Sequence, residues 1–235
     1  MIAVVALVWT QSSFSGVSTQ ATSPVVIGAS KDATLYAESG TTSNGASQSL
    51  FVGVTAGTGD TSIRRTVIAF DMVSAVPAGA TITDVQLRRN RDKGQGAHTI
   101  TIHRLTADWG EGTADTIGSE SRGTANAAQG DSTWTSRFLG TSNWTTSGGD
   151  FVGSVSASTS VGPGSGAFIW DSEGVVVDVQ SWLDNPSTNF GWILKHVNET
   201  TGRTVQRFGS RQNGVTSNQP QLIIFSLSQS RLLHP

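Results

Sequence analysis

Apolar side chains recur at every second position in a series of short runs along this chain. The clearest examples are Ile68 with Phe70, Val85 with Leu87, and Ile100 with Ile102. A period of two belongs to a β-strand that buries one face and leaves the other in water. Runs of this kind, separated by Gly, Pro, Asn and Asp, predict strands at residues 33–38, 48–54, 64–71, 82–90, 98–105, 151–157, 166–170, 190–197, 204–211 and 221–227.

One segment has the period of a helix instead. Val179, Trp182 and Leu183 stand at positions i, i+3 and i+4, and Asp178 is placed to cap the helix that they predict, around residues 178–184. The strands follow one another without the long crossovers that parallel pairs need. The pattern therefore predicts an all-β chain, an antiparallel β-sandwich with one short helix.

Composition narrows the class of protein. The 235 residues include 27 glycines, no cysteine and only 14% charged residues, with a net charge of −2. This length suits one all-β domain, and the lack of cysteine excludes disulfides and zinc–thiolate sites. Because the net charge is small and negative, nucleic acid is not expected as a partner.

The chain begins with an apolar run, residues 2–9, followed by a Ser/Thr/Gln-rich stretch. This pattern is typical of a secretory signal, and the run is too short to span a membrane as a helix. We therefore divide the chain into a signal segment (1–22), one sandwich domain (23–228) and a tail (229–235). The alternative is that the run is an ordered strand of the mature protein through which copies associate.

Several segments resemble, in order along the chain, a family of secreted bacterial modules called DNRLRE-domain proteins. The segments are Arg64 to Asp71, Pro77 to Leu87, Thr101 to Gly112, Gly130 to Trp134, Trp144 to Phe151, Asp178 to Leu183, Asn189 to Trp192, Phe208 to Arg211 and Pro220 to Ile224. Some members of this family are classed with carbohydrate-binding modules. The resemblance implies a jelly-roll-like sandwich, an extracellular location and a polysaccharide or cell-surface glycan as partner.

The sequence shows no recognisable catalytic set. The carboxylate pairs Asp108 with Glu111 and Asp171 with Glu173 are too close in sequence to face each other across a glycosidase cleft. No histidine accompanies a Gly-x-Ser-x-Gly elbow, and no metal-binding or phosphate-binding motif is present. We therefore predict that the protein is not an enzyme.

Four residues are candidates for contact with a sugar. Arg88, His103 and Arg104 lie on or beside strands, where guanidinium groups can pair with uronate carboxylates or sulfates. His103 belongs to the polar face of strand 98–105, which we expect to face solvent, and Trp109 is the best candidate for an exposed stacking ring. The alternatives are a solvated face with local salt bridges and, for Trp109, a buried loop anchor.

Calcium is the inorganic partner that the sequence favours, as a structural ion bound by loop carboxylates. The candidate ligands are Asp32, Asp71, Asp171 and Asp178. The alternative is that Asp178 caps the helix and the others are turn residues or partners of arginine. Arg64, Arg65, Arg207 and Arg211 match the family's motifs, and they could equally serve the structure by bonding to carbonyls or buried carboxylates.

Three functions follow from these observations. The first is a noncatalytic secreted module for carbohydrate binding or cell-surface adhesion, with anionic polysaccharide as its ligand. The second is a structural subunit of an extracellular assembly or filament that uses strand addition. The third, with least support, is a polysaccharide hydrolase or lyase.

Overall fold

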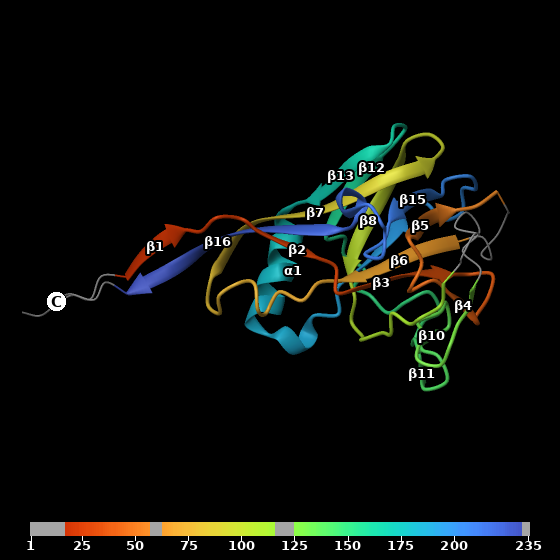
Figure 1. Cartoon of the computed structure of the whole chain (residues 1–235), viewed down its shortest axis with the longest axis horizontal. Helices are drawn as coiled ribbons and strands as arrows, with labels where there is room; N and C mark the ends of the chain where they lie inside the picture. The colour runs from red at the N-terminus through yellow and green to blue at the C-terminus, as the bar shows by residue number, and fades with distance from the viewer. Residues whose placement is uncertain (1–16, 57–62, 116–124, 232–235) are drawn as a thin grey trace, which may run out of the picture.

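The computed structural model describes residues 17–56, 63–115 and 125–231 (Figure 1). In this part of the chain nearly all regular structure is antiparallel β-sheet, accompanied by a single α-helix. The prediction of an all-β chain with one short helix is therefore confirmed. No helix in the described residues is long and apolar enough to cross a membrane.

The main sheet curls so that two halves face each other. One half contains β2 (Val25–Gly28), β16 (Gln221–Arg231), β7 (Thr81–Gly94), β13 (Gly166–Asp171) and β15 (Gln206–Gly209). The other contains β3 (Lys31–Tyr36), β6 (Ile63–Ala69), β14 (Trp192–His196), β8 (His98–Arg104) and β12 (Ala157–Val161).

Strand β5 (Ser49–Val54) joins the two halves. Its first part pairs with β15, whereas Gly53 and Val54 pair with β6. Gly53 has a φ of 120°, and a Cβ there would lie 2.6 Å from the Thr204 carbonyl oxygen. Only glycine suits both constraints, so this residue allows the strand to pass from one half to the other.

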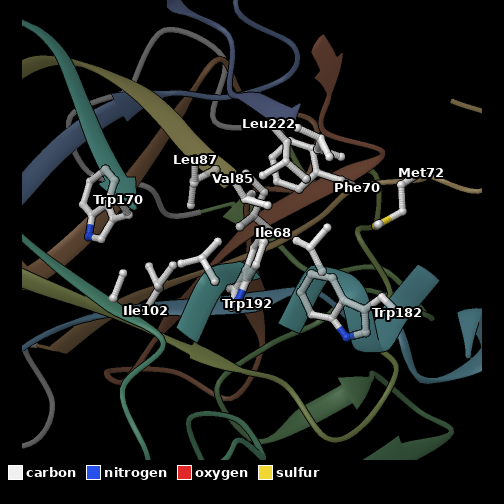
Figure 2. Close-up of a cluster of buried hydrophobic side chains, with 14 of the residues drawn as sticks. Ile68, Phe70, Met72, Val85, Leu87, Ile102, Trp170, Trp182, Trp192 and Leu222 are labelled. Carbon is white, nitrogen blue, oxygen red and sulfur yellow. The ribbon is translucent and has the colours of Figure 1, made fainter. Parts of the chain in front are cut away.

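The main core lies between the two halves and the helix. The six residues of the alternating pairs, Ile68, Phe70, Val85, Leu87, Ile100 and Ile102, are buried in this cluster with relative exposures of 1% or less. Trp182 of the helical period is buried there too, together with Trp192, Leu222 and Ile224. Figure 2 shows Trp182, Trp192 and Leu222 in this cluster. The rings of Trp182 and Trp192 are in contact, with centroids 4.5 Å apart. Alternation thus identifies the inner face of each strand because side chains of successive residues point to opposite faces.

Helix α1 (Glu173–Asp184) begins five residues before the predicted start at Asp178. Its N-cap is Ser172, whose Oγ accepts a hydrogen bond from the Val175 backbone N–H. The prediction that Asp178 caps the helix is wrong, because Asp178 lies buried in the middle of the helix. The β-branched run Val175 to Val177 concealed the first turn, since these residues favour strands.

Replacing Ser172 with alanine removes the cap of α1. We expect the free energy of unfolding to fall by about 1 kcal/mol, because the N–H of Val175 loses the capping hydroxyl of residue 172. Chemical denaturation of the Ser172→Ala and Ser172→Thr variants tests this expectation. The threonine variant retains a capping hydroxyl and should lie closer to the parent, and equal losses in both variants would contradict the capping role.

The predicted strand at 151–157 is wrong. Phe151 forms an isolated bridge with Leu105, and β12 begins only at Ala157. Between them, the carbonyl oxygens of Val152 and Ser154 both contact His103 Nδ1. The chain therefore turns inward over β8 at this point, which a continuous strand could not do.

The long segment after β8 covers the outer face of β3, β6 and β14. It contains three short ladder elements, β9 (Ala125–Asn126), β10 (Ser136–Phe138) and β11 (Ser142–Asn143), the first of which pairs with β4 (Thr42–Ser43). A second apolar cluster forms where the segment meets the sheet: Ala33, Leu35, Val67, Ala69, Leu105, Trp109, Trp144 and Ile193. The segment therefore supplies a cover for the sheet.

Part of the predicted signal segment is ordered. Residues 17–21 form β1 (Val17–Ala21), which pairs with the end of β16 from Leu227 to Arg231. Figure 1 shows this pair extending away from the body of the molecule. The apolar run at residues 2–9 lies outside the described residues.

Candidate functional site

The structure buries two of the four predicted sugar-contact residues. His103 is 6% exposed and Trp109 is 1% exposed. His103 Nδ1 lies 3.1 Å from the carbonyl oxygens of both Val152 and Ser154, and burial lowers its pKa. The expectation that the polar face of strand 98–105 is open to solvent is therefore wrong at His103, because the chain that follows Phe151 covers it.

Trp109 is a buried loop anchor, the alternative to an exposed ring. Its Nε1 donates to the Phe190 carbonyl oxygen at 3.0 Å, and the Lys31 ammonium lies 4.5 Å from the ring centroid. The expectation of an exposed stacking ring is wrong, because this residue fixes the long segment to the sheet. An aromatic residue between polar neighbours in a loop does not by itself distinguish these two roles.

Arg88 and Arg104 lie in different halves of the sheet. Arg88 Nη1 donates to the Ser217 carbonyl oxygen at 3.2 Å. Arg104 reaches helix α1, where its Nη1 donates to Ser181 Oγ at 3.1 Å and its Nε lies 3.6 Å from Asp178 Oδ1. Each of the predicted sugar-contact residues thus has its own protein partners, and the described contacts do not unite them in one site.

The four predicted calcium ligands are also separate. Asp32 accepts from the Arg211 N–H at 2.8 Å, Asp71 from the Val73 N–H at 3.2 Å, and Asp178 from Trp192 Nε1 at 2.8 Å. Asp171 lines a shallow hollow with Asp84 and Glu173 at the start of α1. Among the described residues no group of three His, Cys, Asp or Glu side chains is arranged to hold a metal ion. Structural calcium stays a prediction.

Four arginines form two-pronged pairs with carboxylates. The pairs are Arg64 with Glu38, Arg65 with Glu199, Arg207 with Asp92, and Arg211 with Glu111. Each guanidinium donates two hydrogen bonds to one carboxylate, the geometry that best holds two segments together. The structural alternative for these arginines, pairing with carboxylates, is therefore confirmed.

Two of these pairs border a pocket of about 640 Å³, which we call the cationic pocket. Its cationic lining residues are Arg64, Lys93, Arg203 and Arg207, and its apolar lining includes Phe51 and Val205. The volume falls in the range of roughly 300–1,000 Å³ that is usual for small-molecule sites. The cationic pocket is therefore large enough for a small ligand, and its lining carries charges of one sign.

A β-bulge explains how Lys93 reaches the pocket. Arg207 pairs in register with Lys93, whereas the next residue, Phe208, pairs with Arg91, so Asp92 is the extra residue in β7. Bulges re-aim side chains. Here the bulge places both Asp92 and Lys93 beside Arg207, while Arg89 and Arg91 remain buried within the sandwich.

Lys93 and Arg203 differ from the other two cations of the pocket. Arg64 and Arg207 are held by Glu38 and Asp92, whereas no carboxylate in the described part of the chain pairs with Lys93 or Arg203. Both of these side chains are exposed. The pocket therefore contains two positive charges that are free to contact a ligand.

Arg203 also has an unusual backbone. Its φ is 62°, and within the described residues every other positive φ belongs to a glycine. Its N–H donates to the Thr55 carbonyl oxygen at 2.9 Å, which holds the loop against the end of β5. A left-handed backbone conformation is unfavourable for an arginine, and residues in such strained conformations are often found at functional sites.

Sequence reasoning identified Arg64 and Arg207 but did not group them with Lys93 and Arg203. Lys93 belongs to the basic run that starts at Arg88, and only the bulge shows which members point outward. The loop around Arg203 carries no recognisable motif. No family model matches the chain, and no curated protein matches it either.

Proposed function

We propose that this chain is a secreted, noncatalytic β-sandwich module of the DNRLRE type that binds an anionic polysaccharide in the cationic pocket. The observation that carries the proposal is the presence, in a cavity of about 640 Å³, of Lys93 and Arg203, two cations that no carboxylate of the described residues pairs with. Lys93 lies at the end of β7, and Arg203 lies in the loop that leads into β15.

The chemistry of the pocket suits an anionic sugar. The guanidinium of Arg203 offers a planar pair of donors to a carboxylate or sulfate, and Lys93 adds a second positive charge. Phe51 and Val205 supply apolar surface for the carbon face of a sugar ring. A neutral sugar would leave both cations without a counter-charge, so the pocket favours an acidic one.

The carboxylates near the pocket support a binding role over a hydrolytic one. A glycosidase needs one carboxyl group that can donate a proton and a second that is free to act as a base or nucleophile. Glu38 and Asp92 each accept two hydrogen bonds from an arginine. Such pairing occupies the oxygens that catalysis would use.

The double variant Lys93→Ala, Arg203→Gly tests the proposal. Glycine accepts the left-handed backbone of residue 203, so this variant removes both charges while keeping the loop conformation. We expect affinity for a soluble polyuronate to fall about 10- to 100-fold, because each charged contact contributes roughly 1 kcal/mol. For the parent, affinity should also fall as salt rises, because exposed charge pairs are screened.

The matched control is Arg88→Ala, Arg104→Ala, which removes two arginines outside the pocket lining. Isothermal titration calorimetry on both variants, after circular dichroism has shown that they fold, separates the two sites. Equal affinity of the pocket variant and the parent contradicts the pocket. A glycan array on which no acidic polymer binds the parent contradicts the function itself.

A second candidate function, a structural subunit that associates by strand addition, is favoured by the pair of strands at one end of the molecule. The pairing of β16 with β7 ends at Leu227, and beyond it β16 continues only with β1. Two strands alone have marginal stability in water and open edges. Light scattering of the full chain and of a chain lacking residues 1–22 tests it, since only the full chain should form larger particles.

A further inference from the structure

We infer that the cationic pocket takes a single acidic sugar unit at the end of a chain, and that it does not bind along the length of a polyanion. This inference rests on the proposed function. It concerns whether the protein binds the end or the interior of the polysaccharide chain. Three features of the described residues lead to it.

The first feature is the number of chain segments that border the pocket. Its lining comes from four separate segments: β5 with the residues after it, the start of β6, the end of β7, and the loop that leads from Arg203 into β15. A site for the middle of a polymer must let the chain enter and leave, which favours an extended groove. A pocket bordered by four described segments, in the size range of single small ligands, suits a terminal unit better.

The second feature is the distribution of charge. The pocket has two unpaired cations, Lys93 and Arg203, enough for one or two negative groups. The carboxylates at its border are Glu38 and Asp92, and both are partly exposed. Each of these carboxylates is already paired with an arginine of the lining, so units of a polyuronate beyond the first would meet no further unpaired cation in the described lining.

The third feature is the charge of the residues that line two other hollows in the described part of the protein. One, of about 480 Å³, includes Asp150 and Phe151 and has Asp150 as the charged residue in its lining. The other, of about 400 Å³, is lined by Asp84, Asp171 and Glu173. Neither hollow supplies a cation, so neither is suited to a further unit of an acidic chain.

Within the pocket, Lys93 and Arg203 would contact the ligand in different ways. Arg203 projects from a left-handed backbone that is held by a hydrogen bond to Thr55, which fixes the point from which its side chain extends. Lys93 is presented by the bulge in β7 and provides a point charge. A carboxylate on a terminal sugar can meet both, with its ring against Phe51 and Val205.

Calorimetry with a series of polyuronate oligosaccharides, from trimers to 20-mers, tests the inference on the full-length protein. We expect the dissociation constant, expressed per chain, to stay within about twofold across the series, with one protein bound per chain. A site for internal units would instead gain affinity roughly in proportion to the number of overlapping positions, and several proteins would bind each long chain.

The outcomes separate this inference from the function on which it rests. If affinity per chain rises with length and several proteins bind each 20-mer, the end-specific site is wrong while acidic polysaccharide binding stands. If no oligomer of any length binds, and sulfated oligomers of the same lengths also fail, the proposed function is wrong. The Lys93→Ala, Arg203→Gly variant should weaken binding by the same factor at every length, and a loss that grows with length would also overturn the inference.

Discussion

Replacing Trp192 with alanine should lower the free energy of unfolding by about 3–5 kcal/mol, among the largest effects of any single substitution in this chain. Trp192 is fully buried, and its ring packs against Trp182 and, edge-on, against Phe70 at a centroid distance of 6.4 Å (Figure 2). Alanine leaves a cavity among rigid neighbours. It also removes the indole N–H that donates to Asp178 Oδ2 at 2.8 Å, in the buried middle of α1.

Trp192→Phe separates the two contributions. Phenylalanine retains most of the packing but loses the N–H, so Asp178 keeps Ser156 as the donor to the same oxygen. We expect a smaller loss, about 1–3 kcal/mol, from the loss of one of the two hydrogen bonds to this buried oxygen and from the smaller ring. Urea denaturation of both variants measures these values, and a loss below about 1 kcal/mol for the alanine variant would contradict the role of this residue in the core.

The core could be predicted from sequence because its determinants are local. In a strand, Val85 and Leu87 share a face whatever their partners are, and the same holds for Ile100 and Ile102. The inner faces were therefore found without knowledge of strand order. The start of α1 was missed because Ser172 is a good cap, but the valines after it favour strands.

The candidate site could not be predicted because it depends on contacts between distant parts of the chain. Lys93 reaches the pocket through a bulge that exists only in the pairing of β7 with β15. Arg203 is held by a carbonyl of Thr55, far away in sequence. Conversely, His103 and Trp109 looked accessible because nothing local shows that residues 106–115 and 125–156 fold back over the sheet.

A buried group of charged residues makes the free energy of unfolding depend on pH. Asp32 on β3 and Arg89 on β7 are both fully buried. Asp32 Oδ2 accepts from the Arg211 N–H at 2.8 Å, and the Asp32 N–H donates to Glu111 Oε1 at 2.9 Å. The second carboxylate oxygen, Oδ1, has no hydrogen-bond partner among the described residues, so few hydrogen bonds stabilise a charge on this buried group.

Burial raises the pKa of Asp32 to about 7, because removal from water outweighs the attraction of Arg89 and the hydrogen bond from Arg211. In the unfolded chain the same carboxyl has a pKa near its ordinary value of 3.8. Between these two values the folded protein holds a proton that the unfolded chain has lost. The contribution of Asp32 to stability is therefore fully present below pH 4 and is lost as pH rises to 7, by an amount on the order of 4 kcal/mol.

The variant Asp32→Asn is the test, because asparagine has the shape of the protonated acid and cannot ionise. At pH 4 we expect the variant and the parent to have similar free energies of unfolding, within about 1 kcal/mol. As pH rises from 4 to 8, the parent should lose stability relative to the variant, because the unfolded parent gives up a proton that its folded form retains up to about pH 7. If Asp32 is instead ionised as the counter-charge of Arg89 throughout this range, asparagine leaves a buried cation unpaired. The variant would then be about 3–5 kcal/mol less stable than the parent at pH 8, and that result would overturn the prediction.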